Sequence, residues 1–303
     1  MANLLDIRRR IKSVKNTQQI TKAMKMVSAA KLKRAQDRVV SARPFAVKMR
    51  EVMGDLASRT SDDYSHPLLD ARGDERYLVI LITSDKGLCG AFNTNVVKAA
   101  SAFLRDNAGK QVEMIPVGRK GREFFRSRNV KFVTEYIGLT NKGRIDFAEA
   151  MEIAREVIRL FGEDTELDKV FLIYNEFKSV LQQRVVVEQL LPVAHVGAQT
   201  SNDALTATAT SDAQAVQSTD YIYEQTPESI FGILLPMFIE TQVFRALLES
   251  VASEQGARMT AMDAASKNAG ELIGSLTLNM NRIRQAAITN EIIEVVSGAS
   301  VSV

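Results

Sequence analysis

Residues 4–32 read LLDIRRRIKSVKNTQQITKAMKMVSAAKL, and the spacing of the apolar side chains in this stretch decides the fold of the chain. Steps of three and four residues lead from Leu4 along one heptad register to Leu56, which predicts a helix packed in a coiled coil. About 53 residues at the helical rise extend about 80 Å, which is longer than a small globular domain. Twelve of the sixteen register positions are apolar, and the four polar ones are consecutive: Gln18, Thr21, Lys25 and Ser28.

The C-terminal part of the chain carries a second register of the same kind. Thr226 and Pro227 predict a helix start, with the threonine as N-cap and the proline as first helical residue. From Leu248 to Ala287, small Ala and flexible Met side chains recur at the inner positions, which lets two helix backbones approach each other. We expect the two terminal helices to pair antiparallel. Because the second spans about 70 residues, its tip should extend about 25 Å beyond its partner.

Each of these predicted helices contains a proline. Proline lacks the backbone N–H that a helix uses, and its ring clashes with the preceding turn. We therefore expect a bend or a break just before Pro44 and a kink at Pro236.

Between the two long helices the apolar pattern changes to short runs rich in β-branched and aromatic residues. Such runs predict strands, and helix-compatible stretches separate the first four of them. This alternation is typical of an α/β domain with a mainly parallel sheet, and we expect the last strand to pair antiparallel. The predicted strands are 77–83, 112–117, 130–136, 170–174 and 184–191, and the predicted helices are 94–106, 119–127 and 146–161.

The predicted fold class is α/β: a long antiparallel coiled coil of the N- and C-terminal helices plus a central Rossmann-like α/β domain. We divide the chain into an N-terminal shaft helix at 1–62, the central domain at 75–196, a mobile loop at 197–219 and a C-terminal shaft helix at 227–303. The loop prediction rests on a composition of Ala, Thr, Ser, Gln and Asp, which can bury little apolar surface.

The composition excludes several classes of protein. With 46% hydrophobic and 25% charged residues among 303, the chain is that of a folded globular protein. No long uninterrupted apolar run and no signal-peptide pattern is present, so we expect neither a membrane span nor secretion. A single cysteine, Cys89, forms no internal disulfide, and two histidines leave little material for zinc or Cys/His nucleophile chemistry. A reducing compartment follows.

The net charge of +3 is unevenly distributed along the chain. Residues 1–50 hold 14 Lys and Arg against two acids, a charge of +12, and the remainder carries −9. Residues 228–297, in the predicted partner helix, carry −3 and cannot neutralise this basic arm. Nucleic acid, an anionic membrane and an acidic protein surface are all candidate partners of such an arm.

Apolar residues on the outer face of the basic helix bear on this choice. Ile20, Met24, Met26 and Val27 lie off the heptad seam, in the stretch where the seam itself turns polar. A helix that is apolar on its inner and outer faces is typical of an enclosed helix, which favours a protein sleeve over a phosphate backbone. A basic coiled-coil nucleic-acid-binding protein remains the alternative, and it predicts binding that weakens steeply with salt.

A glycine-containing turn, TSDKGLCGAFN at 83–93, follows the first predicted strand and opens a helix, where α/β proteins bind phosphates. It lacks the G-x-G-x-x-G spacing, and the chain has no G-x-x-x-x-G-K-[ST] motif. We interpret it as a tight turn that needs Gly87 and Gly90 for backbone freedom, with Cys89 as a small buried apolar residue. The acidic residues lack a convergent histidine or metal pattern, so an enzymatic role would rest on the α/β domain alone.

Four segments in chain order carry a resemblance to a known family. They are IRRRIKSVKNTQQITKAMKMV at 7–27, TSDKGLCGAFN at 83–93, ASEQGARMTAMD at 252–263 and RQAAITNEIIE at 284–294. Through these segments, which span almost the whole chain, the sequence resembles the γ subunits of F-type ATP synthases.

The resemblance implies a central rotary shaft. The coiled coil would enter a ring of three α and three β subunits around one γ, and the α/β domain would lie beside the ε subunit and the ring of c subunits. Proton flow would turn the shaft, whose asymmetric faces push the catalytic β subunits through their states for ATP synthesis. The implied partner-contact residues are Lys22, Met24, Lys25, Arg258, Arg284, Gln285 and Thr289.

The resemblance also implies what the chain lacks and where it resides. It implies no catalytic residue, cofactor or metal in this subunit, no nucleic-acid partner, and membrane association through the complex only. The paired regulatory cysteines of plant plastid γ subunits are absent and no transit peptide is visible, which favours a bacterial enzyme, peripheral at the cytoplasmic face of the cell membrane. Two segments depart from the family pattern, the long 197–219 connection and the 298–303 tail, and neither touches the four matched segments.

Overall fold

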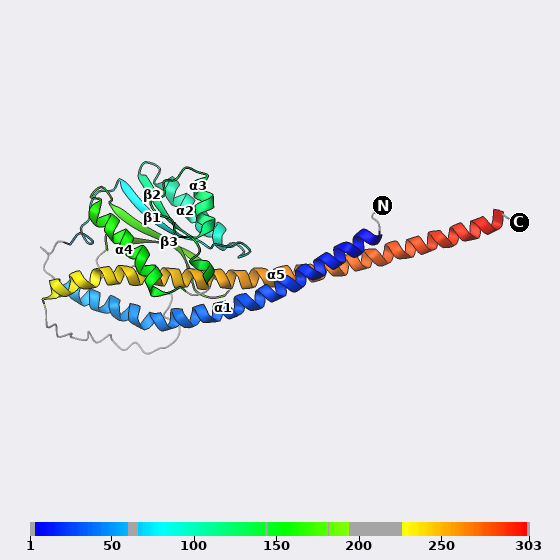
Figure 1. Cartoon of the computed structure of the whole chain (residues 1–303), viewed down its shortest axis with the longest axis horizontal. Coiled ribbons are helices and arrows are strands. Elements are labelled where there is room, and N and C mark those ends of the chain that lie inside the picture. Colours follow the sequence, from blue (N-terminus) through cyan, green and yellow to red (C-terminus); the bar gives the residue numbers. More distant parts are fainter. Residues whose placement is uncertain (1–3, 60–65, 143–144, 181, 194–225, 302–303) are drawn as a thin grey trace.

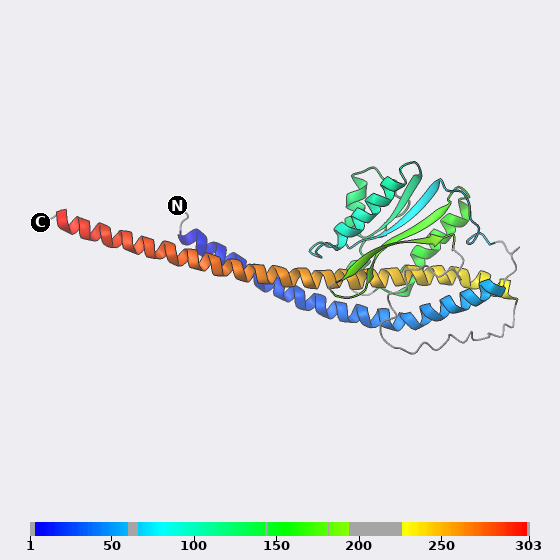
Figure 2. The same cartoon turned by 180° about the vertical axis from the view of Figure 1, so that it is seen from behind.

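A computed structural model of the chain describes residues 4–59, 66–142, 145–180, 182–193 and 226–301. Two long helices, α1 (Leu4–Arg59) and α5 (Pro227–Val301), run side by side in opposite directions, so that both termini lie at one end (Figure 1; Figure 2). All sixteen positions of the first register are buried or half-buried. The predicted antiparallel pair and its seam are therefore confirmed.

The tip of α5 extends beyond α1, as the two lengths predict (Figure 1). From Arg284 to Ser297 every residue of α5 is exposed. The second register is buried or half-buried from Leu248 as far as Ile283, and Ala287 falls in the exposed tip. The stretch from Arg284 to the end of α5 rises about 27 Å, close to the expected overhang.

Both prolines lie inside continuous helices, so a break before Pro44 is ruled out. α1 curves along its length instead (Figure 1). The buried residues Val39, Met49 and Met53 lie on either side of the proline in the core between α1 and its neighbours. This packing on both sides stabilises the helix against the loss of one backbone hydrogen bond.

The central domain contains a four-stranded sheet of order β2-β1-β3-β4. β1 pairs in parallel with both β2 and β3, and β4 pairs antiparallel with β3. The mainly parallel sheet with an antiparallel last strand is as predicted. The strands are β1 (Arg76–Ile82), β2 (Gln111–Val117), β3 (Lys169–Phe177) and β4 (Gln183–Leu191).

The predicted strand at 130–136 does not form. Its residues make only isolated parallel bridges to β2, from Phe132 to Met114 and from Tyr136 to Val117. Tyr136 donates its backbone N–H to the carbonyl of Pro116, 3.0 Å away. Pro116 has no N–H to return along this edge, so a continuous ladder cannot develop there.

Helices cover both faces of the sheet, and α5 lies along one of them (Figure 1). On one face, α5 and α4 share a core with alternate residues of β1, and α1 contributes to the same core. On the other face, α2 and α3 pack against Val79 and Leu81. The helices are α2 (Phe92–Asp106), α3 (Arg119–Arg126) and α4 (Phe147–Glu163), with a short 3₁₀ turn η1 at Thr140–Lys142.

α5 is unusually apolar for an exposed shaft. By length and composition alone it is the one described helix that could cross a membrane, with a mean hydropathy of 1.5 in its most apolar window. Half of that window is buried inside the protein. Its apolar character in this fold is that of a helix that contacts both α1 and the sheet. The predicted 197–219 loop lies outside the described residues, and the division into segments stays a prediction.

Candidate partner-binding site

The seven residues predicted to contact partners fall into two groups on the shaft. Lys22, Met24 and Lys25 lie on α1 and Arg258 on α5, close to the α/β domain. Arg284, Gln285 and Thr289 lie on the exposed tip. Arg258 and Arg284 are about 39 Å apart along the helix axis. The sequence prediction therefore describes two surfaces rather than one site.

Lys25 lies in a cleft between the two helices, of about 420 Å³. Its Nζ atom is 2.6 Å from Oδ1 of Asp263, whose other oxygen is 3.0 Å from Nζ of Lys267. These hydrogen bonds lower the pKa of Asp263. Lys22 lines the same cleft and is exposed. The cleft therefore leaves unneutralised positive charge next to a salt bridge that joins α1 to α5.

The polar positions of the seam lie in this same stretch. Gln18 donates its side-chain N–H to the carbonyl of Ser266, 3.2 Å away, and Gly270 leaves room for it. A Cβ at Gly270 would lie 3.1 Å from Nε2 of Gln18. Thr21 donates to the carbonyl of Gln18, and Ser28 is buried. The bond of Gln18 and the ion pair of Lys25 with Asp263 join the two helices here, which fixes register at the expense of apolar packing.

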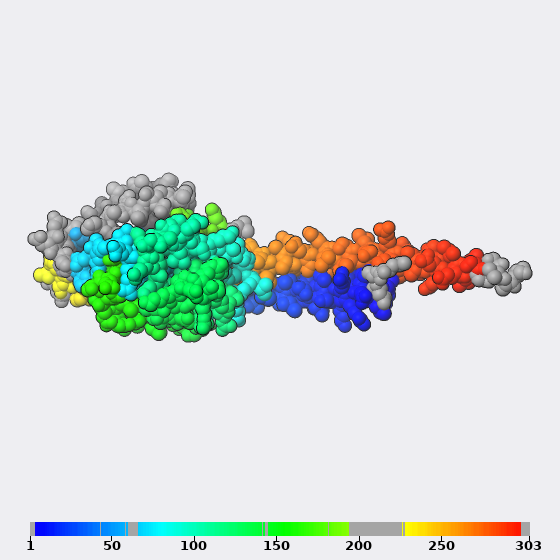
Figure 3. Space-filling model, turned by 90° about the horizontal axis from the view of Figure 1, so that it is seen from above, coloured from blue at the N-terminus to red at the C-terminus, as the bar shows by residue number. Residues whose placement is uncertain are grey.

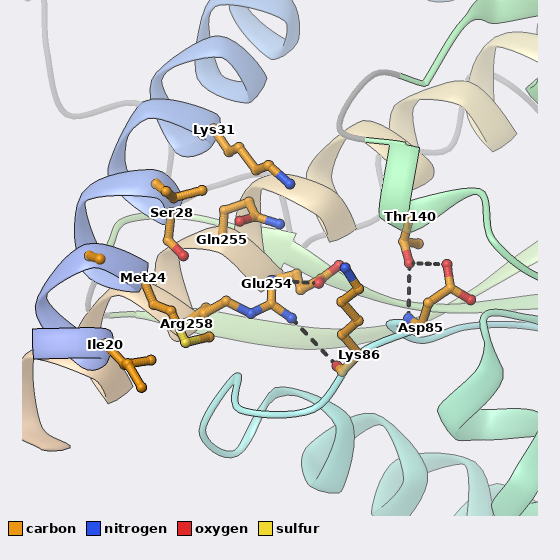
Figure 4. Close-up of a pocket in the computed structure, with 12 residues that line it drawn as sticks. Ile20, Met24, Ser28, Lys31, Asp85, Lys86, Thr140, Glu254, Gln255 and Arg258 are labelled. Atoms are coloured by element: carbon orange, nitrogen blue, oxygen red, sulfur yellow. Dashed lines mark hydrogen bonds and ion pairs between the residues drawn. The ribbon is translucent and has the colours of Figure 1, made fainter. Parts of the chain in front are cut away.

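Met24 lines a second cavity, of about 350 Å³, where α1, α5 and the loop after β1 meet (Figure 4). In Figure 4 the side chains of Ile20 and Met24 form its wall on the α1 side. Glu254 and Arg258 of α5 form the opposite side, next to the backbone of Lys86. The cavity combines an apolar wall with buried charge.

Arg258 is tied into this junction rather than presented to solvent. Its side chain is buried, and Nη1 is 2.7 Å from Oε1 of Glu254. Nη2 donates to the carbonyls of Lys86 and Gly87, at 3.4 and 3.2 Å. The geometry gives Arg258 a partner inside the chain, so its predicted contact with another subunit stays a prediction.

Glu254 is the least satisfied group at the junction. It is only 3% exposed, and among the described residues its Oε2 atom has no hydrogen-bond partner. Desolvation raises the pKa of this carboxyl, and the ion pair with Arg258 opposes that shift. An unpaired buried carboxylate oxygen is costly, so this corner of the cavity favours a hydrogen-bond donor.

The outer face of α1 near the cavity is apolar and basic at once. Ile20, Met26 and Val27 are 59%, 71% and 57% exposed, as predicted for residues off the seam, whereas the prediction is wrong for Met24, which is half-buried and lines the cavity. The cations of the first turns are exposed too: Arg8, Arg9, Arg10, Lys12 and Lys15. Large apolar side chains in such a row indicate a surface that a protein covers.

The tip forms a single exposed helix (Figure 3). Among its described side chains, Ile288, Ile292 and Ile293 are each about half exposed, and Val295 and Val296 more so. The hydroxyl of Thr289 donates to the carbonyl of Gln285 within the helix. An isolated helix with an exposed apolar stripe gains little from folding alone, which indicates a surrounding partner.

The turn after β1 is built differently from the prediction. Gly90 has a φ of +58°, as expected, but Gly87 does not adopt a positive φ, and Leu88 does so instead at +62°. The prediction that the turn needs a glycine at position 87 is therefore wrong. Cys89 is buried, as predicted, and desolvation raises the pKa of its thiol.

A carboxylate lies where α/β proteins commonly bind a phosphate. Oδ1 of Asp85 accepts the backbone N–H of Arg119, at the start of α3, and that of Gly138. Oδ2 accepts the hydroxyl of Thr140 at 2.8 Å. The backbone donors at the carboxyl end of β2 are thus directed at a side chain of this chain.

The sequence did not single out the buried polar residues that join α5 to the sheet. Asn175, Ser250 and Ser253 are each at most 2% exposed, and each serine is hydrogen-bonded to the backbone of Asn175. The sequence signal that could have found them is a pair of serines three residues apart, in the part of α5 that is buried. Within the described part of the chain, no group of three or more His, Cys, Asp or Glu side chains could hold a metal ion.

Comparisons with known proteins agree with the resemblance. The family model described as ATP synthase matches residues 3–301. The ATP synthase γ chain of Solibacter usitatus is 50% identical over 99% of both chains. That of Geotalea daltonii is 49% identical over 99% of this chain and 98% of its own. The nucleic-acid alternative gains no support from these relatives.

Solved structures resemble the chain as well. A chain of the central stalk and c-ring of Tetrahymena thermophila mitochondrial ATP synthase is 28% identical, with a TM-score of 0.57 over 82% of this chain and 99% of its own. A rotor chain of Euglena gracilis mitochondrial ATP synthase is 18% identical, with a TM-score of 0.63 over 94% and 98%. The second match concerns the fold alone.

Proposed function

The chain belongs to the family of ATP synthase γ chains, and from that premise we propose that it turns as the central shaft of a proton-translocating F-type ATP synthase. The observation that carries this proposal is the asymmetry of α5. One half of the helix is buried against α1 and the α/β domain, and the other ends in a bare tip. Rotation of such a body presents different faces to whatever surrounds the tip.

The proposed sleeve of the shaft consists of three α and three β subunits around one γ. The exposed apolar residues Ile20, Met26 and Val27 and the apolar stripe of the tip suit an enclosed bearing. The exposed lysines and arginines of α1 suit acidic surfaces of the β subunits. Contacts would thus act in two tiers, one at the cleft of Lys22 and Lys25 and one at Arg284, Gln285 and Thr289.

The α/β domain lies at the end of the shaft opposite the tip (Figure 1). We place the ε subunit and the c-ring against this end, at the cytoplasmic face of the cell membrane, with the chain peripheral to it. Membrane association then comes from the complex. α5 supports this reading because half of its most apolar window is already covered by the chain itself.

We propose that this subunit performs no catalysis of its own. In the part of the chain that the structure describes, the backbone donors of Arg119, after β2, and of Gly138 are directed at Asp85, and no metal-binding cluster is found. The chain would act on ATP chemistry by positioning the catalytic β subunits.

Co-expression with α and β subunits tests the proposed function. We expect one copy of the chain to purify with three α and three β subunits, and ATP hydrolysis by the complex to turn it. Failure to co-purify under conditions where α and β assemble would overturn the proposal. Charge reversal of Lys22 and Lys25 together should weaken coupling, and normal coupling at all salt concentrations would remove the electrostatic part.

A further inference from the structure

The buried face of α5 changes from apolar to polar where it meets the central domain. Ser250, Ser253, Glu254 and Arg258 are all at most 8% exposed. Apolar side chains could be buried here at a lower cost in free energy, because each buried polar group needs a hydrogen-bond partner. Ser250 and Ser253 bond to the sheet, and Arg258 bonds to the loop after β1 and to Glu254 on α5 itself.

The two serines bind a pair of backbone groups that the sheet leaves free. β1 pairs with β3 as far as Leu81 and Ile173, whereas β3 continues to Phe177. Beyond that point, Asn175 donates its N–H to Oγ of Ser250 at 3.3 Å. Its carbonyl accepts the hydroxyl of Ser253 at 3.2 Å. α5 thus occupies the place of a neighbouring strand.

The side chain of Asn175 extends the connection to a third element. Nδ2 donates to the carbonyl of Phe92, the first residue of α2, at 3.4 Å. Asn175 is 2% exposed. One residue of β3 therefore connects the sheet, α5 and α2.

A second connection lies two turns further along α5. Arg258 donates to the carbonyls of Lys86 and Gly87, in the loop after β1. The same loop approaches α5 closely at Gly90, where a Cβ would lie 3.7 Å from the carbonyl of Ala257. These contacts on β3 and on the loop add to two ion pairs between the domain and α5, Arg155 with Glu240 and Arg245 with Glu188.

α1 makes no comparable set of polar contacts with the domain among the described residues. Arg38 donates to the carbonyl of Ile145 at 3.5 Å, the longest hydrogen bond of this group. α1 packs chiefly against α5. Torque applied to the domain would therefore enter the shaft through α5.

We propose that Asn175, Ser250 and Ser253 form a torsional lock that makes the α/β domain and the shaft turn as one body. Apolar contacts are non-directional and tolerate small rotations, whereas hydrogen bonds weaken steeply with angle. Rotating α5 against the sheet would leave the N–H and carbonyl of Asn175 buried without partners. The three residues position the shaft relative to the domain, and this inference rests on the proposed function.

The lock can be tested in the α₃β₃γ complex with the double variant Ser250→Ala and Ser253→Ala. Ser127 is exposed on the domain and Cys89 is buried, so a Ser127→Cys substitution allows a bead to be attached selectively. Angular fluctuations of the bead in the paused complex report the torsional stiffness between the domain and the held tip. Ser275→Ala is the matched control, because that hydroxyl bonds only within α5, to Leu272, and is exposed.

We expect the double variant to lose about half or more of the torsional stiffness, because both directional bonds to Asn175 are gone. The Ser275→Ala control should behave like the unmodified chain. Hydrogen exchange of the Asn175 amide should accelerate in the double variant while the rest of β3 stays protected, which establishes that the fold is intact.

A purely structural role predicts a different result. The double variant would then unfold at a lower temperature, but its stiffness in the folded complex would equal that of the control, and the lock would be refuted. Loss of the proposed function is distinguishable, because the unmodified chain would then fail to rotate at all when ATP is hydrolysed.

Discussion

Two stretches of α5 contrast in almost every respect. Between Glu240 and Arg258 nearly every residue is buried, and polar side chains are bonded to the sheet, to α4 or to the loop after β1. Between Arg284 and Ser297 every residue is exposed, and apolar side chains face water. One continuous helix thus contains a segment whose polar side chains bond mostly within the chain, Oε2 of Glu254 excepted, and a segment whose apolar side chains are left exposed.

The contrast separates residues that stabilise the fold of the chain from residues that are available to bind its partners. In the buried stretch, most buried polar residues have a partner within the chain: Ser250, for example, accepts the backbone N–H of Asn175 near the end of β3. In the tip, Ile292 and Ile293 have none, because they contact little else in the chain. Changes in the first stretch should alter stability, and changes in the second should alter assembly.

The largest expected effect separates the two stretches by stability. Leu247→Ala removes a fully buried side chain from the core that α5 shares with the sheet, and should cost about 2–5 kcal/mol of unfolding free energy. Ile288→Ala, in the tip, should change it by less than about 0.5 kcal/mol. Denaturant unfolding of both variants measures the difference. Equal losses of unfolding free energy would contradict the contrast between the two stretches.

The next effect concerns Asp85, whose carboxylate accepts three donors from the segments around β2. Asp85→Ala removes the acceptor of these buried and part-buried donors and should cost about 1–3 kcal/mol. Asp85→Asn keeps an oxygen for the backbone N–H groups and should cost less. The same unfolding assay ranks the two variants, and an equal loss would show that charge rather than hydrogen bonding dominates.

A smaller effect is expected in the tip from Arg284→Glu. The stability of the chain should not change, because Arg284 is exposed. Affinity for the α and β subunits should fall about ten-fold at low salt, since a reversed charge repels an acidic surface. Assembly titrations at two salt concentrations measure this, with Arg282→Glu as a neighbouring control. Unchanged affinity would exclude Arg284 as a contact.

The smallest effect compares two carboxylates on α5 by the pH dependence of stability. The pKa of Asp263 is lowered by Lys25 and Lys267, so its stabilising contribution should be lost as pH falls through that lowered pKa. The pKa of Glu254 is raised by burial, so stability should be lost as pH rises through its pKa.

Two variants isolate these opposite slopes. In Asp263→Asn, the loss of stability at acid pH should disappear. In Glu254→Gln, the loss of stability as pH rises above the ordinary glutamate pKa should become smaller. Unfolding midpoints across pH measure both. Relative to the unmodified chain, the two substitutions should change the slope of stability against pH in opposite directions. Changes in the same direction would contradict these two pKa shifts.

Much of this fold could be predicted because the two ends of the chain repeat a simple period. The seam from Leu4 to Leu56 is buried throughout, and the overhang follows from the two helix lengths. A strand was predicted wrongly at 130–136 because the composition is that of a strand, while the missing N–H of Pro116 on the neighbouring edge prevents a continuous ladder. The composition of residues 130–136 says nothing about the proline on the neighbouring strand.

The candidate site was predicted less completely than the fold. Lys25 and Arg258 appear alike as basic motif residues, but one lies in an open cleft and the other is buried against Glu254. Only tertiary packing separates them. The bond between Asn175 and Ser250 joins residues 75 positions apart, which a periodicity argument does not reach.

We propose above all that this chain rotates as one body inside a ring of α and β subunits. The most direct test immobilises the ring and follows a bead attached through Ser127→Cys on the α/β domain while ATP is hydrolysed. We predict continuous rotation in one direction that stops when ATP is removed. Full hydrolysis with a stationary bead, firmly attached to the domain, would contradict the account.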